Sequence, residues 1–281
     1  LIMSIKTILV YLPSEKNAAT ILAPALKIAG ERSAHVIGLH LTPDLPVYGE
    51  FPAEVSEEVI VRLQKAGTDA AAAAKRVFDE WVEKSSVTHE WRCFAASYAA
   101  GTDLIAQQGR TADLIICGKP SDDIPDAWSD FAETAIIRSG RPVLIVPGTK
   151  APKTIGEHVI IAWNDTREAA RAVLDSLDLL KAASTVRAVT LIEKESQRGA
   201  AEALGADLIA NLGRHGITAS LDVSYAGSGS AGEAILSRLL DEGCDLLIMG
   251  GYSRSRLREM IFGGASRDIL RDTWAPTLLS H

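Results

Sequence analysis

The sequence contains two copies of one pattern, and this repetition restricts the possible folds more than any other feature. The apolar segment 113–118 begins with aspartate and ends with glycine, and it has a counterpart of the same length at 245–250. Each half of the chain also opens with an apolar run, Ile8–Leu12 in the first and Val159–Trp163 in the second. Self-similarity of this kind indicates a duplicated structural unit.

The boundary between the copies lies in the proline- and glycine-containing segment 147–152, which neither a helix nor a sheet would tolerate. A chain of 281 residues is long enough for about two domains. We therefore predict one domain over residues 1–148 and a second over residues 155–281.

Each copy contains short runs that are apolar throughout, a pattern typical of strands buried on both faces of a parallel sheet. Alternation of such strands with helices predicts an α/β fold of two tandem doubly wound domains, each a mostly parallel five-stranded sheet flanked by helices. The predicted strands are Ile8–Leu12, Val36–Leu41, Trp91–Ala95, Leu114–Cys117 and Val143–Val146 in the first copy, and Val159–Trp163, Val186–Ile192, Ala219–Tyr225, Leu246–Met249 and Thr277–Leu279 in the second.

Two helices have recognisable ends. We predict that Asn17–Ala29 ends at Gly30 as its C′ residue, and that Arg167–Ala182 begins after Asp165 as N-cap. The other predicted helices are Glu54–Lys84, which Gly67 can interrupt, Gly232–Asp241 and Ser266–Arg271.

Composition excludes several classes of protein. With 29 basic and 36 acidic residues the formal net charge is −7, which argues against a broad electrostatic surface for nucleic acid or a membrane. No apolar run approaches the roughly 20 residues of a membrane-spanning helix. The three cysteines have no CxxC spacing, so we expect reduced thiols and a cytoplasmic protein without a signal peptide.

The segment 249–267 has the strongest functional signal in the chain. It follows a predicted buried strand, contains two glycine pairs and carries four arginines in an otherwise acidic protein. Its second glycine pair opens a predicted helix, where free N–H groups and the helix dipole favour a phosphate. The alternative is a glycine-rich turn with solvated arginines.

This segment resembles the nucleotide loop of the universal stress protein family, in which Gly, two residues, Gly, nine residues and Gly precede Ser or Thr. Gly250, Ser253 and Gly263 occupy the glycine positions and Gly264 occupies the Ser/Thr position, so two positions depart from the pattern. The resemblance covers both halves of the chain and implies the tandem form of the family, with ATP, with or without Mg²⁺, as its ligand.

In members of that family that bind ATP, an Asp at the end of the first strand meets the adenosine. Asn164 falls on this position in the second copy, and its neighbour Asp165 can either contact the ligand or cap the helix. The cofactor-binding residues that the resemblance implies are Ala162, Trp163, Asn164, Asp165, Gly250, Gly251, Ser253, Arg254, Gly263, Gly264, Ala265 and Ser266.

The first copy lacks these features. No glycine follows Gly118 until Gly140, and Pro13 stands where the first-strand Asp of the family would be. The intervening loop carries four aspartates that would repel a triphosphate, Asp122, Asp123, Asp126 and Asp130. We expect a degenerate nucleotide loop, and we interpret the aspartates as a solvated acidic loop rather than a cation site.

Other motifs are weak or absent. The segment Gly227–Gly232 is either a flexible connection or a wall of the nucleotide pocket. There is no P-loop, no GxSxG elbow and no metal-ligand spacing among the histidines, so we predict no catalytic and no metal-binding residues.

Three functions remain open from the sequence. The first is a stress-response regulatory protein that binds ATP in its C-terminal domain and acts on an unidentified protein partner. The second is a nucleotide-free tandem scaffold of the same family, and the third is a slow ATP hydrolase. The resemblance also implies an internal pseudo-dimer through the last strands, Val143–Val146 and Pro276–Leu279, and leaves a homodimer of whole chains open.

Overall fold

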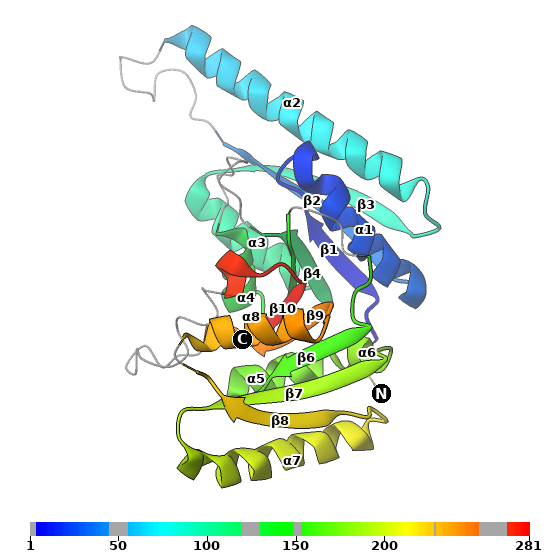
Figure 1. The fold of residues 1–281 in the computed structure, drawn as a ribbon. Helices are drawn as coiled ribbons and strands as arrows, with labels where there is room; N and C mark the ends of the chain where they lie inside the picture. The colour runs from blue at the N-terminus through cyan, green and yellow to red at the C-terminus, as the bar shows by residue number, and fades with distance from the viewer. Residues whose placement is uncertain (1–3, 45–55, 120–129, 149–152, 228, 253–268) are drawn as a thin grey trace.

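The chain forms one ten-stranded sheet with helices on both faces (Figure 1). The computed structural model describes residues 4–44, 56–119, 130–148, 153–227, 229–252 and 269–281. Strands occur in the order β3-β2-β1-β4-β5-β10-β9-β6-β7-β8. Their bounds are β1 Thr7–Tyr11, β2 His35–Pro43, β3 His89–Ala96, β4 Leu114–Gly118, β5 Val143–Val146, β6 His158–Ala162, β7 Thr185–Ile192, β8 Ser220–Tyr225, β9 Leu246–Gly250 and β10 Thr277–Ser280.

Within each repeat the strands are parallel, and the two repeats join where β10 pairs antiparallel with β5. At this junction Leu144 lies opposite Leu278. The ten predicted strands, the fold class and the pairing through the last strands are confirmed. Because the junction is antiparallel, the strands of the two repeats run in opposite directions. The carboxyl ends of the strands in one repeat therefore lie at the same end of the sheet as the amino ends of the strands in the other.

Helices cover both faces and divide the apolar core into two layers. The helices are α1 Glu15–Arg32, α2 Glu57–Val82, α3 Tyr98–Gly109, α4 Phe131–Arg138, α5 Arg167–Asp175, α6 Leu177–Leu180, α7 Arg198–Arg214 and α8 Ala231–Asp241. One core layer lies under α1, α2, α5, α6 and α7, and the other under α3, α4 and α8. None of the described helices is both long enough and apolar enough to span a bilayer.

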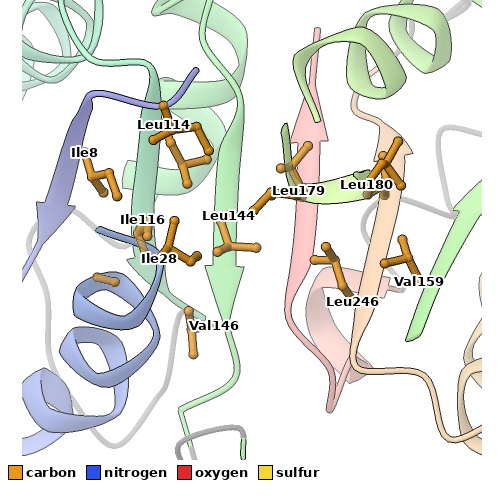
Figure 2. Close-up of a cluster of buried hydrophobic side chains, with 14 of the residues drawn as sticks. Ile8, Ile28, Leu114, Ile116, Leu144, Val146, Val159, Leu179, Leu180 and Leu246 are labelled. Carbon is orange, nitrogen blue, oxygen red and sulfur yellow. The ribbon is translucent and has the colours of Figure 1, made fainter. Parts of the chain in front are cut away.

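The first core layer is continuous across the junction between the repeats. Figure 2 shows Ile8 and Leu144 of the first repeat in the same cluster as Val159 and Leu246 of the second. An ion pair strengthens this contact, since Nε of Arg32 in α1 lies 2.8 Å from Oδ2 of Asp178 in α6. The two repeats therefore share one apolar layer, in addition to the strand pairing.

Several predicted helix ends are wrong. Helix α1 continues through Gly30 to Arg32 and ends at Ser33, which takes the left-handed conformation with φ 51°. Helix α2 passes through Gly67 without a break. The predicted helix Arg167–Ala182 breaks at Ser176 into α5 and α6.

The predicted helix Ser266–Arg271 lies partly outside the described residues, and residues 269–272 are helical. Helices α3, α4 and α7 were not among those predicted.

Candidate functional site

The carboxyl ends of the first two strands can be compared residue by residue between the repeats. In the first repeat the N–H of Leu12 donates to the carbonyl of Leu39, and in the second the N–H of Trp163 donates to the carbonyl of Val189, both at 2.9 Å. Leu12 is therefore equivalent to Trp163. By the same register Tyr11 is equivalent to Ala162, and His40 to Thr190.

The second repeat leaves two buried polar atoms without a partner at this place. Trp163 and Thr190 are adjacent across β6 and β7, and each is only 9% exposed. Neither the indole Nε1 of Trp163 nor the hydroxyl of Thr190 has a hydrogen-bond partner among the described residues. A buried donor without an acceptor is costly, by about 1–3 kcal/mol. Such atoms indicate a place where a bound water or a ligand supplies the missing bond.

Asn164 follows directly, and its side chain is held by its own loop. The Oγ1 of Thr166 donates to Oδ1 of Asn164 at 2.8 Å and accepts from the N–H of Ala169 at 3.2 Å. With Oδ1 occupied, the amide nitrogen of Asn164 carries the side chain's remaining donors. The loop thus presents an amide donor at the end of β6, where the sequence analysis placed a ligand contact.

The predicted cap of α5 is wrong. Thr166, and not Asp165, is the N-cap residue. Asp165 instead takes a left-handed backbone conformation with φ 53° and is exposed. Aspartate tolerates this conformation better than most residues because its short polar side chain can bond locally. The turn at Asp165 separates Asn164 from the first turn of α5.

Gly250 and Gly251 end β9 in tight packing. A Cβ on Gly250 would lie 2.6 Å from the backbone nitrogen of Ala169, inside the first turn of α5. A Cβ on Gly251 would lie 3.2 Å from Ile136 of α4. Packing against the protein's own helices therefore accounts for the absence of a side chain at Gly250, without any ligand. From the sequence, both glycines had been predicted to contact the ligand.

The remaining predicted site residues lie outside the described residues. They are Ser253, Arg254, Gly263, Gly264, Ala265 and Ser266. The structure thus brings Ala162, Trp163, Asn164 and Asp165 to the end of β6, and Gly250 lies beside the first turn of α5.

The glycine-rich connection before α8 forms a capping box. The Oγ of Ser230 accepts from the N–H of Glu233 at 3.1 Å, and a carboxylate oxygen of Glu233 accepts from the N–H of Ser230 at 2.9 Å. Gly229 lies against the Glu233 carboxylate, which would have to shift to admit a Cβ. Residues of this connection therefore cap helix α8. Capping was not part of either sequence interpretation, a flexible connection or a wall of the nucleotide pocket.

In the first repeat, the equivalent strand ends are packed or bonded within the protein on both faces of the sheet. The ring of Tyr11 stacks on Phe131 of α4 with 3.8 Å between the centroids. His40 is buried, and its Nδ1–H donates to the Leu12 carbonyl at 2.7 Å. This difference was visible in the sequence, since aligning the repeats places Tyr11 at the position of Ala162, but it was not among the sequence predictions.

The acidic loop of the first repeat is largely outside the described residues. Asp122, Asp123 and Asp126 belong to that part, and Asp130 precedes α4. The described residues contain no cluster of three or more His, Cys, Asp or Glu side chains that could hold a metal ion.

Comparisons with known proteins support the fold. No protein-family model and no curated protein matches the sequence. Among solved structures, a universal stress protein from Archaeoglobus fulgidus is similar with a TM-score of 0.71 and 13% identity, over 98% of this chain and 95% of that one. A functionally unknown protein from Pseudomonas aeruginosa is similar with a TM-score of 0.61 and 17% identity, over 98% of this chain and 92% of that one.

A further structure from Pseudomonas aeruginosa, also assigned to the universal stress proteins, has a TM-score of 0.63 and 15% identity over 98% of this chain and 92% of its own. These similarities extend over both repeats and concern the course of the backbone. The protein therefore has the universal stress protein fold in its tandem form.

Proposed function

We propose that this chain is a stress-response protein that binds one adenine nucleotide, ATP, in its second repeat. The observation that carries the proposal is the difference between the equivalent strand ends. In the second repeat Trp163 and Thr190 keep buried polar atoms without partners, whereas in the first repeat His40 makes its bond within the protein.

The polar groups at this strand end suit an acceptor-rich heterocycle. The indole N–H of Trp163 is a donor only, the Thr190 hydroxyl can donate or accept, and the Asn164 amide adds further donors. Adenine presents ring nitrogens that accept such bonds. Ala162 carries a smaller side chain than its equivalent Tyr11, whose ring stacks on Phe131, and both face the core layer on the other side of the sheet from Trp163.

The phosphates would be held by the glycine- and arginine-rich segment that follows Gly250, as the resemblance implies. Backbone N–H groups and arginines are the usual partners of phosphate oxygens. Any Mg²⁺ would come with the nucleotide, because the described residues offer no acidic or histidine cluster for it. We propose binding and not hydrolysis, because the sequence carries no recognised motif for orienting water or holding Mg²⁺.

Exchanging the equivalent residues of the two repeats tests the proposal. Isothermal titration of the wild-type protein with ATP should give one site per chain. Ala162→Tyr gives the second repeat the tyrosine of the first, and we expect it to abolish the binding heat because Ala162 is among the residues that the resemblance places at the nucleotide. Tyr11→Ala is the matched control, and one site of unchanged affinity should remain, because His40 still closes the first repeat.

Two results would overturn the proposal. One is the absence of saturable heat with millimolar ATP in a folded wild-type protein, which would favour the nucleotide-free scaffold. The other is an unchanged affinity of the Ala162→Tyr protein, provided that circular dichroism shows it to be folded. Mass spectrometry of gently purified protein adds an independent measurement, since a co-purifying adenine nucleotide is expected only if the chain binds one.

A further inference from the structure

The two outer strands of the sheet differ in how their free edges are treated. Figure 1 shows β3 near α2 at one end of the sheet and β8 beside α7 at the other. An unpaired edge presents a row of N–H and C=O groups that another strand can bind. Proteins commonly cover such edges, so the difference between β3 and β8 carries information about partners.

The edge of β8 is partly occupied by the protein's own side chains, at the Val223 carbonyl. The N–H of Ala226 donates to Ile192 of β7, so by alternation Val223 directs its backbone groups away from the sheet. Nη1 of Arg198 donates to the Val223 carbonyl at 2.8 Å. The hydroxyl of Tyr225 and the guanidinium of Arg198 both bind the Glu195 carboxylate, which holds this cover in place.

The edge of β3 has no such cover among the described residues. The carbonyls of Thr88 and Ala96 accept from β2 and from the residue that follows it, so even-numbered residues face β2. The backbone groups of Trp91, Cys93 and Ala95 therefore point away from the sheet, and no described residue bonds to them. The side chains of Cys93 and Ala95 are exposed as well.

We propose that a second copy of this chain pairs antiparallel with this edge, with the two-fold axis at Trp91. In this register Glu90 of each copy lies opposite Arg92 of the other, at a non-hydrogen-bonded pair where side chains approach most closely. The two-fold axis generates this contact twice, so the interface contains two pairs of opposite charges. This interface goes beyond the nucleotide site and does not depend on it.

The charges of β3 favour this register over its neighbours. An axis at Arg92 would place two arginines opposite each other, which is unfavourable. An axis at Cys93 would place Arg92 opposite Phe94 and Glu90 opposite Ala96. Arg92 is already oriented, since its Nη1 donates to Oε1 of Gln108 in α3 at 2.6 Å and it also pairs with Glu90 of its own strand. Little side-chain entropy then remains to be lost on pairing.

Sedimentation velocity over a concentration series tests the interface. The wild-type chain should form a reversible dimer. Glu90→Arg or Arg92→Glu alone places like charges opposite each other and should raise the dimer dissociation constant about tenfold or more. The double exchange Glu90→Arg with Arg92→Glu restores opposite charges at both contacts and should restore the dimer.

A matched pair of proline variants tests whether the dimer forms through the edge of β3 or the edge of β8. Cys93 and Val223 are equivalent in the two repeats, and the N–H of each points away from the sheet. Proline there removes a donor that the monomer does not use. Cys93→Pro should yield monomer, while Val223→Pro should leave the dimer unchanged. A wild-type chain that is monomeric at every concentration, or a dimer that survives both Cys93→Pro and Glu90→Arg in folded protein, would overturn the proposal.

Discussion

The first and second repeats share a backbone plan and differ in what stands at the ends of their first two strands. In the first, Tyr11 stacks on Phe131, and His40 bonds to the Leu12 carbonyl. In the second, the smaller Ala162 replaces the tyrosine, and Trp163 and Thr190 keep unpartnered polar atoms. Because strand pairing depends on backbone groups, a duplicated sheet can preserve its topology while its side chains bond within the protein in one repeat and leave buried polar atoms unpartnered in the other.

The largest effect is expected from alanine at the glycines that end β4 and β9. A Cβ at Gly250 would meet the backbone of α5 at 2.6 Å, whereas at Gly118 it would meet the side-chain carbon Cδ1 of Ile21 at 3.0 Å. A side chain can shift more easily than a helix backbone. We expect Gly250→Ala to lower the free energy of unfolding by about 3 kcal/mol and Gly118→Ala by about 1 kcal/mol. Urea denaturation monitored by circular dichroism measures both, and equal losses would contradict the assigned difference in packing.

The next effect concerns His40 and its equivalent Thr190. His40→Ala removes a buried ring and leaves the Leu12 carbonyl without its partner, so stability should fall by about 2 kcal/mol or more. Thr190→Val removes a hydroxyl that has no partner, and the nucleotide-free protein should keep its stability or gain about 1 kcal/mol. Thermal unfolding without nucleotide compares the two variants. A large loss of stability in Thr190→Val would show that the Thr190 hydroxyl is hydrogen-bonded in the native protein. The proposed difference between His40 and Thr190 would then be wrong.

The smallest effect sharpens the comparison of the two sheet edges. The hydrogen bond from Tyr225, and after it that from Arg198, lowers the pKa of Glu195 below its ordinary value. A lowered pKa in the folded state means that the interaction stabilises the fold above the ordinary glutamate pKa and is lost as the pH falls through the lowered one. In Tyr225→Phe the pKa of Glu195 should rise toward its ordinary value. Carboxyl NMR titration measures this shift, and an unchanged pKa would mean that Tyr225 does not hold the cover of β8.

The strands could be predicted because most are apolar runs bounded by polar or turn residues, although β3, β7 and β8 also carry charged residues. Helix ends were less predictable. Gly30 was expected to end α1, but the helix continues to Arg32 and Ser33 takes the left-handed conformation instead. Glycine is permitted in that conformation but is not confined to it. Helix α7 is exposed over much of its surface and its apolar face is narrow, so periodicity gave little signal for it.

The candidate site could be predicted only in part. The sequence placed Asn164 at the end of the first strand of the second repeat, which the structure confirms as its position. It did not identify Thr190, because the residue lies on the next strand and has no local motif. The sequence also could not decide whether Asp165 contacts the ligand or caps the helix. Whether Asp165 or Thr166 is the N-cap depends on the backbone conformation of a single turn.

The order of residues along the chain was enough to establish the duplication, the parallel strands and the absence of nucleotide-loop glycines in the first repeat. These properties follow from periodicity and residue type within short segments, where neighbours in sequence are neighbours in space. The bond between His40 and Leu12, the unpartnered atoms of Trp163 and Thr190, and the uncovered edge of β3 were visible only once the strands had been assembled. Each depends on contacts between residues that are distant along the chain, and whether a buried polar atom finds a partner is settled by packing rather than by local sequence.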